Sequence, residues 1–258
     1  MTATDYEYRG LLAEAWDVLR GDTSDWSDRF FYRDVIKQSG QPVLDVGCGT
    51  GRLLLDYAAQ GIDIDGVDNS PEMLALCRTK AAAQDLPVAM YEQYVETLEL
   101  PRHYRTILIP SSSLQLIIDP AAVDRALQRL AAHLLPGGTI TASIMTLWKE
   151  GEPLESEWEA SAVRSDDGVT FRRVARTRFD PGIDCEHTED LYQKIVNEQV
   201  VSEEQHRRSP ATRSYTQAQA RDLFERAGFS DVRLYHEFTH EPVQPEDSLF
   251  TVVACWPE

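Results

Sequence analysis

The segment Val43–Gly51, which reads Val-Leu-Asp-Val-Gly-Cys-Gly-Thr-Gly, constrains the fold more than any other part of this 258-residue chain. Apolar residues that suit a buried parallel strand lead directly into glycines at 47, 49 and 51, and apolar residues with helical spacing follow between 53 and 58. Glycine has no Cβ atom, so it lets the backbone turn sharply and approach a ligand closely. The segment therefore predicts a strand, a tight turn and a helix whose N-terminus faces a binding crevice.

A second acidic residue follows at the distance expected for a nucleoside site. Asp68 ends another apolar stretch, which contains Ile62, Ile64 and Val67, and it lies about 20 positions after Asp45. A carboxylate at the end of a strand can accept hydrogen bonds from both hydroxyls of a ribose. The two segments together predict that the crevice binds a nucleoside.

The spacing of the glycines indicates which nucleoside. A dinucleotide fingerprint reads G-x-G-x-x-G and rests a pyrophosphate on the helix N-terminus, whereas this chain reads Asp45-x-Gly47-x-Gly49-x-Gly51. A carboxylate two residues before the first glycine would repel a pyrophosphate, but it can help to hold a cationic amino-acid tail. In this motif the chain resembles the class I S-adenosylmethionine-dependent methyltransferases, and Asp68-Asn69-Ser70-Pro71-Glu72-Met73-Leu74 resembles the second motif of that family.

The resemblance implies S-adenosylmethionine as cofactor, S-adenosylhomocysteine as product, and a set of residues that hold them. Asp45, Gly47 and Gly49 are expected around the amino-acid tail, with the small Cys48 inside the same turn, and Asp68 is expected on the ribose. Asn69 and Met73 are expected beside the adenine, and Ser111 is expected to face the cofactor. Tyr94 stands where the family often has an acid, so the Tyr94 side chain or the Val95 amide is expected to serve the adenine instead.

The order of apolar segments predicts an α/β fold, because strands and helices alternate. The resemblance implies a Rossmann-like, seven-stranded, mostly parallel sheet with helices on both faces, formed by residues 1–147 and 215–258, in which residues 135–139 turn into the fifth strand. Residues 148–214 lose helical periodicity and predict a small antiparallel β insertion, and the resemblance implies that it covers the active site. Residues 1–40 have helical spacing, and the resemblance implies that they form a lid over the cofactor.

Composition and charge restrict the kinds of partner that the chain can bind. The net charge of −18 argues against a nucleic-acid partner, and no apolar run reaches the roughly 20 residues that span a membrane. The N-terminal residues lack the pattern of a signal peptide, and the four cysteines form no C-x-x-C pair. We therefore expect a cytoplasmic monomer or homodimer with a small-molecule acceptor, without a metal site, and with a local basic patch near 172–178 and 207–213.

The sequence gives weaker evidence for the residues that contact the methyl acceptor. Arg173 lies on an otherwise mostly apolar strand face and can either clamp an anionic substrate or form a structural ion pair. His187 and His206 lie in the insertion and can act as bases or be ordinary surface histidines. Tyr32 is a further candidate for the pocket wall, as is Tyr215.

The sequence thus predicts a methyltransferase that acts on nitrogen or oxygen of a small metabolite. Three alternatives stay open: a non-catalytic nucleoside-binding protein with the same fold, a methyltransferase of a protein or tRNA partner, and an NAD-dependent oxidoreductase. Methyl transfer depends largely on positioning, so the sequence need not contain a recognisable catalytic residue.

Overall fold

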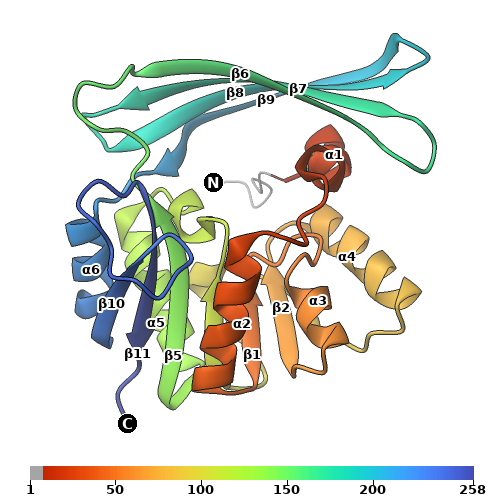
Figure 1. Cartoon of the computed structure of the whole chain (residues 1–258). Coiled ribbons are helices and arrows are strands. Elements are labelled where there is room, and N and C mark those ends of the chain that lie inside the picture. The colour runs from red at the N-terminus through yellow and green to blue at the C-terminus, as the bar shows by residue number, and fades with distance from the viewer. Residues whose placement is uncertain (1–7) are drawn as a thin grey trace.

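The computed structural model describes residues 8–258, and the first seven residues of the expected lid lie outside this part of the chain. The described chain forms a seven-stranded sheet with helices on both faces. A four-stranded sheet arches above it, over one end of its strands (Figure 1). The expected α/β fold with a β insertion is therefore confirmed.

The large sheet has the strand order β10-β11-β5-β4-β1-β2-β3. Strands β3, β2, β1, β4 and β5 pair in parallel, whereas β11 runs antiparallel to β5 and β10 antiparallel to β11. The strand order reverses between β1 and β4, and ligands bind beyond the carboxyl ends of the strands at such a point. The bounds are β1 Val43–Val46, β2 Ile64–Asp68, β3 Met90–Glu92, β4 Tyr104–Ile109, β5 Leu134–Met145, β10 Ser230–His236 and β11 Leu249–Cys255.

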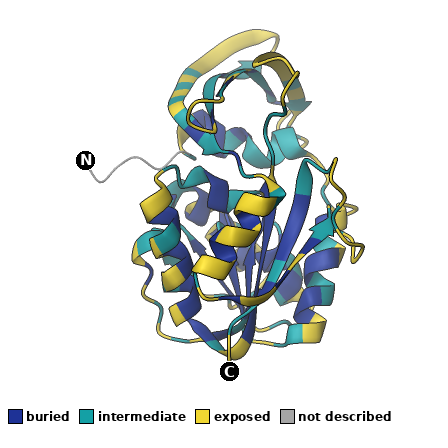
Figure 2. Ribbon diagram, turned by 90° about the vertical axis from the view of Figure 1, so that its left-hand side faces the viewer, coloured by how far each residue is buried: buried dark blue, intermediate teal, exposed yellow. Residues whose placement is uncertain are grey.

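Helices pack on both faces because neighbouring residues of each strand point to opposite sides. Val43 and Leu108 belong to one core, with α2, α3 and α4, while Leu44 and Ile107 belong to the other, with α5 and α6. Figure 2 shows the buried strands enclosed by helices with exposed outer sides. The bounds are α2 Ser27–Ser39, α3 Leu54–Ala59, α4 Pro71–Ala83, α5 Pro120–Ala132 and α6 Gln217–Arg226, with short 3₁₀ turns at Val95–Thr97 and Ser113–Leu116.

The insertion is an antiparallel sheet of β6 Glu155–Val163, β7 Thr170–Asp180, β8 Cys185–Val196 and β9 Gln199–Arg213, in that order. Helix α1 (Gly10–Arg20) lies between this sheet and the main domain (Figure 1). Its apolar side packs Leu11, Leu12 and Ala15 against Phe171 and Tyr192 of the small sheet. The small sheet thus gains a core of its own from the N-terminal helix.

Side chains cap the N-termini of α5 and α6, and the stretch 135–139 departs from its expected structure. The Asp119 side chain accepts from the Ala121 amide at the start of α5, and Thr216 and Gln219 form a capping box at the start of α6. The stretch 135–139, expected as a turn, is instead part of β5. The register between β4 and β5 shifts there, so the extra residues form a bulge rather than a break in the strand.

Candidate functional site

A cavity of about 900 Å³ opens at the carboxyl ends of β1, β2 and β4, beneath the small sheet. Its wall includes all ten residues that the sequence assigned to the cofactor: Asp45, Gly47, Cys48, Gly49, Asp68, Asn69, Met73, Tyr94, Val95 and Ser111. The wall continues past them over Leu116, Ile117, Ile118 and Ala122 to β9. The volume lies within the range of small-molecule and cofactor sites.

The glycine turn has the conformation that its sequence predicted. Gly47, Gly49 and Gly51 have φ angles of 70°, 54° and 88°, a region that other residues rarely adopt. A Cβ atom on Gly51 would lie 2.6 Å from the Cys77 sulfur, so glycine is also required sterically. The turn is fixed to the sheet because the amides of Gly47 and Cys48 both donate to the Val67 carbonyl.

Asp68 joins the two motifs directly. Its carboxylate accepts from the Gly49 amide at 2.9 Å and from the Ser70 amide at 2.8 Å. Burial raises the pKa of Asp68, and these backbone hydrogen bonds oppose the rise. The two oxygens of a carboxylate offer about four acceptor positions, so Asp68 can hold the glycine turn and accept from a ligand hydroxyl at the same time.

Asp45 is a buried carboxyl at the base of the cavity. It is 1% exposed, and its Oδ1 atom is buried without a hydrogen-bond partner. Burial raises the pKa of Asp45 to about 7, Arg52 opposes the shift, and Asp68 adds to it. Arg52 itself is held by hydrogen bonds to Asp28. An unpaired acceptor beside a cavity fits a cationic ligand group such as an ammonium.

Cys48 has no features of a nucleophile. Its side chain is buried, and burial raises the pKa of the thiol well above its ordinary value. A thiol must ionise to react, so this environment keeps Cys48 inert. In residues 8–258 no group of three His, Cys, Asp or Glu side chains is arranged to hold a metal ion. In the same residues no helix is long and apolar enough to cross a membrane.

Helix α1 contributes residues to the cavity that the sequence analysis did not assign. Trp16 and Arg20 both line it, and the Arg20 guanidinium stacks over the rings of Trp16 and Trp26. Arg20 forms no ion pair with any residue of the described chain, and burial lowers the pKa of its guanidinium. Their spacing, four residues apart on a helix, places both on one face and is the signal that identifies the pair.

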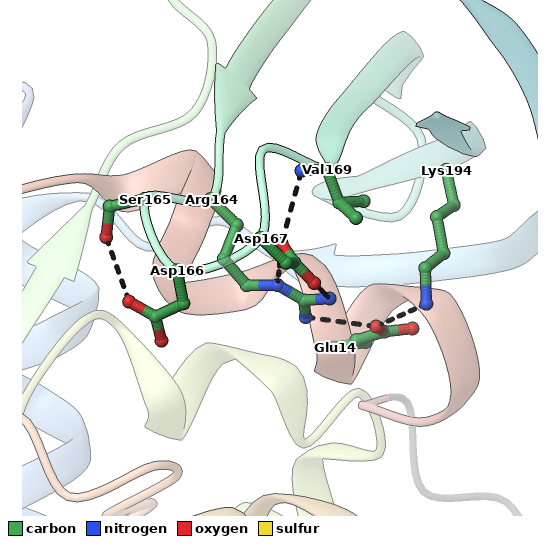
Figure 3. A network of polar contacts seen from close by, with 7 residues as sticks. All are labelled: Glu14, Arg164, Ser165, Asp166, Asp167, Val169 and Lys194. Carbon is green, nitrogen blue, oxygen red and sulfur yellow. Dashed lines mark hydrogen bonds and ion pairs between the residues drawn. The ribbon is translucent and has the colours of Figure 1, made fainter. Parts of the chain in front are cut away.

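Ion pairs hold α1 against the small sheet. Glu14 accepts from Arg164 at 3.1 Å and from Lys194 at 2.8 Å, and Arg164 also pairs with Asp167 (Figure 3). Burial raises the pKa of Glu14, but the two hydrogen bonds outweigh it and lower the pKa overall. The N-terminus of α1 is satisfied by the Glu204 carboxylate, which accepts from the Leu11 amide at 2.8 Å.

The three catalytic candidates lie outside the cavity wall. Arg173 pairs with Asp190 at 2.9 Å, which is the structural ion pair that the sequence left open. His187 shares a second, smaller depression with charged residues of the small sheet, and its Nδ1 contacts the Ser209 hydroxyl. Tyr32, on α2, is fully buried in the core, and burial raises the pKa of its hydroxyl. Periodicity in the sequence indicated which helix or strand carries each of these side chains, but not whether the side chain faces the cavity.

Comparison with known proteins identifies the central part of the chain. Residues 43–138 match the family described as "Methyltransferase domain". A dTDP-3-amino-3,6-dideoxy-alpha-D-glucopyranose N,N-dimethyltransferase of Streptomyces fradiae is 26% identical over 176 residues, 66% of each chain. A ubiquinone biosynthesis O-methyltransferase of Sodalis glossinidius is 34% identical over 107 residues, 41% of this chain and 42% of the relative. The chain spans about half of the length of these first curated relatives.

The fold extends the similarity to the rest of the chain. The crystal structure of an S-adenosylmethionine-dependent methyltransferase from Clostridium acetobutylicum ATCC 824 superimposes with a TM-score of 0.78 at 17% identity. The superposition covers 95% of this chain and 97% of that one, so it extends over the insertion as well as the main domain. The resemblance to the class I methyltransferases is therefore confirmed in the fold.

Proposed function

We propose that this chain, which has the fold of the S-adenosylmethionine-dependent methyltransferases, transfers a methyl group from S-adenosylmethionine to a nitrogen or oxygen atom of a small metabolite (EC 2.1.1.-). One observation carries the proposal. A single cavity joins the glycine turn and Asp68 to an apolar region between Leu116 and Ala122. Cofactor and acceptor would then share one enclosed space, as a direct transfer requires.

The residues of the cavity fit the cofactor. The buried Asp45 oxygen without a partner suits the ammonium of the amino-acid tail, and the Asp68 carboxylate suits the ribose hydroxyls. Met73 and Asn69 line the side where we expect the adenine. When bound, the cofactor supplies an activated methyl group on a sulfonium whose leaving group is a neutral thioether.

Catalysis by this chain would then rest on positioning. His187, Arg173 and Tyr32 lie outside the cavity wall, so none of these catalytic candidates is favoured. Holding an acceptor in line with the methyl group can supply about 7–11 kcal/mol of the barrier. An acceptor that is unprotonated at neutral pH would need no general base.

Two observations support a small acceptor. The small sheet arches above the main domain (Figure 1), and its strand β9 contributes to the wall of the cavity, which restricts the space for an acceptor. The relatives named above act on an amino sugar nucleotide and in ubiquinone biosynthesis. The net charge of −18 disfavours a tRNA substrate. Cytoplasmic location and a monomeric or homodimeric state stay predictions.

Calorimetric titration with S-adenosylhomocysteine tests the cofactor, and NADH is the control ligand. Micromolar binding of S-adenosylhomocysteine alone supports the proposal, whereas binding of NADH alone would support an oxidoreductase. Transfer of a labelled methyl group to members of an acceptor panel then tests the activity. Binding without transfer to small molecules, proteins or tRNA would favour the non-catalytic alternative.

A further inference from the structure

The far end of the cavity carries positive charge that the proposed cofactor does not use. Two arginines, Arg125 and Arg213, line this end beside Asp119. The cofactor end has the opposite balance, because Asp45, Asp68 and Glu96 line it with Arg20 and Arg52. An excess of negative charge suits a cofactor that carries a sulfonium. In a chain with a net charge of −18, the arginines are a local exception.

Arg213 is fixed in the wall without a carboxylate partner. Its Nε donates to the Ile118 carbonyl at 2.8 Å and one Nη donates to the Ile183 carbonyl at 3.3 Å. In the described residues it forms no ion pair, so neutral acceptors hold its guanidinium and its charge stays uncompensated. The Arg213 carbonyl in turn accepts from the buried Gln115 amide at 2.6 Å, which fixes the end of β9 to the loop after β4.

Arg125 is only weakly neutralised. The distance between its Nη2 atom and the Asp119 carboxylate is 3.8 Å, and the other Asp119 oxygen caps the Ala121 amide. The Arg125 side chain is 55% exposed, so it can reorient toward a ligand at low cost. Between the arginines and the glycine turn, the wall is formed by Leu116, Ile117 and Ile118.

We propose, on the basis of the function proposed above, that Arg125 and Arg213 bind a phosphate or diphosphate group of the methyl acceptor. A phosphate carries a charge of about −1.5 to −2 at neutral pH, which suits two guanidinium groups beside one carboxylate. Guanidinium groups bind phosphate oxygens through paired hydrogen bonds. The acceptor is then a phosphorylated metabolite whose less polar body lies along Leu116–Ile118, toward the cofactor.

Calorimetric titration with inorganic pyrophosphate tests this subsite in the protein saturated with S-adenosylhomocysteine. Arg213→Gln should weaken pyrophosphate binding by about ten-fold and Arg125→Gln by about five-fold, because each removes a charged hydrogen-bond donor. Arg207→Gln is the matched control. Arg207 lies on the same strand, β9, as Arg213 but pairs with Glu189, so its loss should change the affinity by less than about two-fold.

Three results would overturn the proposal: no saturable binding of pyrophosphate, an equal loss in Arg207→Gln, or tighter binding of malonate, a dianion without phosphorus. Arg213→Gln removes a bond to Ile118 and can perturb the fold, but Arg125 is exposed and its variant keeps the test decisive. Failure of S-adenosylhomocysteine to bind would refute the function proposed above. Failure of pyrophosphate alone would refute only the subsite.

Discussion

The substitution Asp45→Asn removes the charge of the buried Asp45 carboxyl but keeps a side chain of nearly the same shape, so it tests the effect of that charge on stability. The folded protein buries Asp45 completely, and its pKa rises from 3.8 to about 7. Between about pH 4 and 7 the native protein therefore holds a proton that the unfolded chain has lost, so stability falls as pH rises through this window. At 1.36 kcal/mol per pKa unit, ionised Asp45 costs about 4 kcal/mol above pH 7.

The variant should therefore be more stable than the wild type at pH 8 and similar to it at pH 4. For a domain of this size the difference corresponds to a Tm higher by up to about 10 °C at pH 8, measured by calorimetry without ligand. Asp65→Asn is the matched control, because Asp65 is a buried strand carboxyl that accepts from Tyr104 at 2.9 Å and pairs with Arg102 at 3.4 Å. Its loss should lower the Tm at pH 8.

The same ionisation should govern the binding of S-adenosylhomocysteine, whose ammonium needs the Asp45 carboxylate. With a pKa of about 7, the ionised fraction rises about five-fold from pH 6 to pH 7, and the affinity should rise with it. Asp45→Asn should bind more weakly and lose this dependence. An unchanged pH slope in Asp45→Asn, or a Tm at pH 8 no higher than that of the wild type, would refute the reasoning.

Three further changes test the site and its support. Asp68→Ala should weaken S-adenosylhomocysteine binding by at least about ten-fold and lower the Tm, because it removes the acceptor of the Gly49 amide as well as the proposed ribose contact. Wild-type affinity in calorimetry would mean that the ribose binds at another residue. Gly51→Ala should destabilise the protein by about 2 kcal/mol more than Gly61→Ala in urea unfolding, since both have positive φ but only the Gly51 Cβ would meet other atoms; equal losses would exclude the steric reason. Glu14→Gln should speed hydrogen exchange in α1 and cost at most about 1 kcal/mol, whereas unchanged exchange would mean that packing alone holds the helix.

Local signals predicted most of the fold. The strand and turn at 43–51, the capping residue Asp119 and the capping box at Thr216 act over a few residues, so the sequence shows them directly. The turn expected at 135–139 was wrong because β4 pairs on both sides of this stretch and draws it into the strand as a bulge. Pairing between distant strands is a tertiary effect that glycine and proline content does not reveal.

The sequence by itself predicted the residues that line the part of the cavity where we propose the cofactor, since they follow the ends of consecutive strands and the carboxyl ends of parallel strands meet at one edge. Tertiary structure alone decided the rest of the cavity wall. Arg20 reaches the cavity because α1 packs on the small sheet, and Arg213 reaches it because β9 returns beside the loop after β4. Arg173, on β7 of the same small sheet, instead pairs with Asp190. These contacts join segments far apart in the chain, and no local pattern distinguishes an arginine that meets a carboxylate from one that faces a cavity.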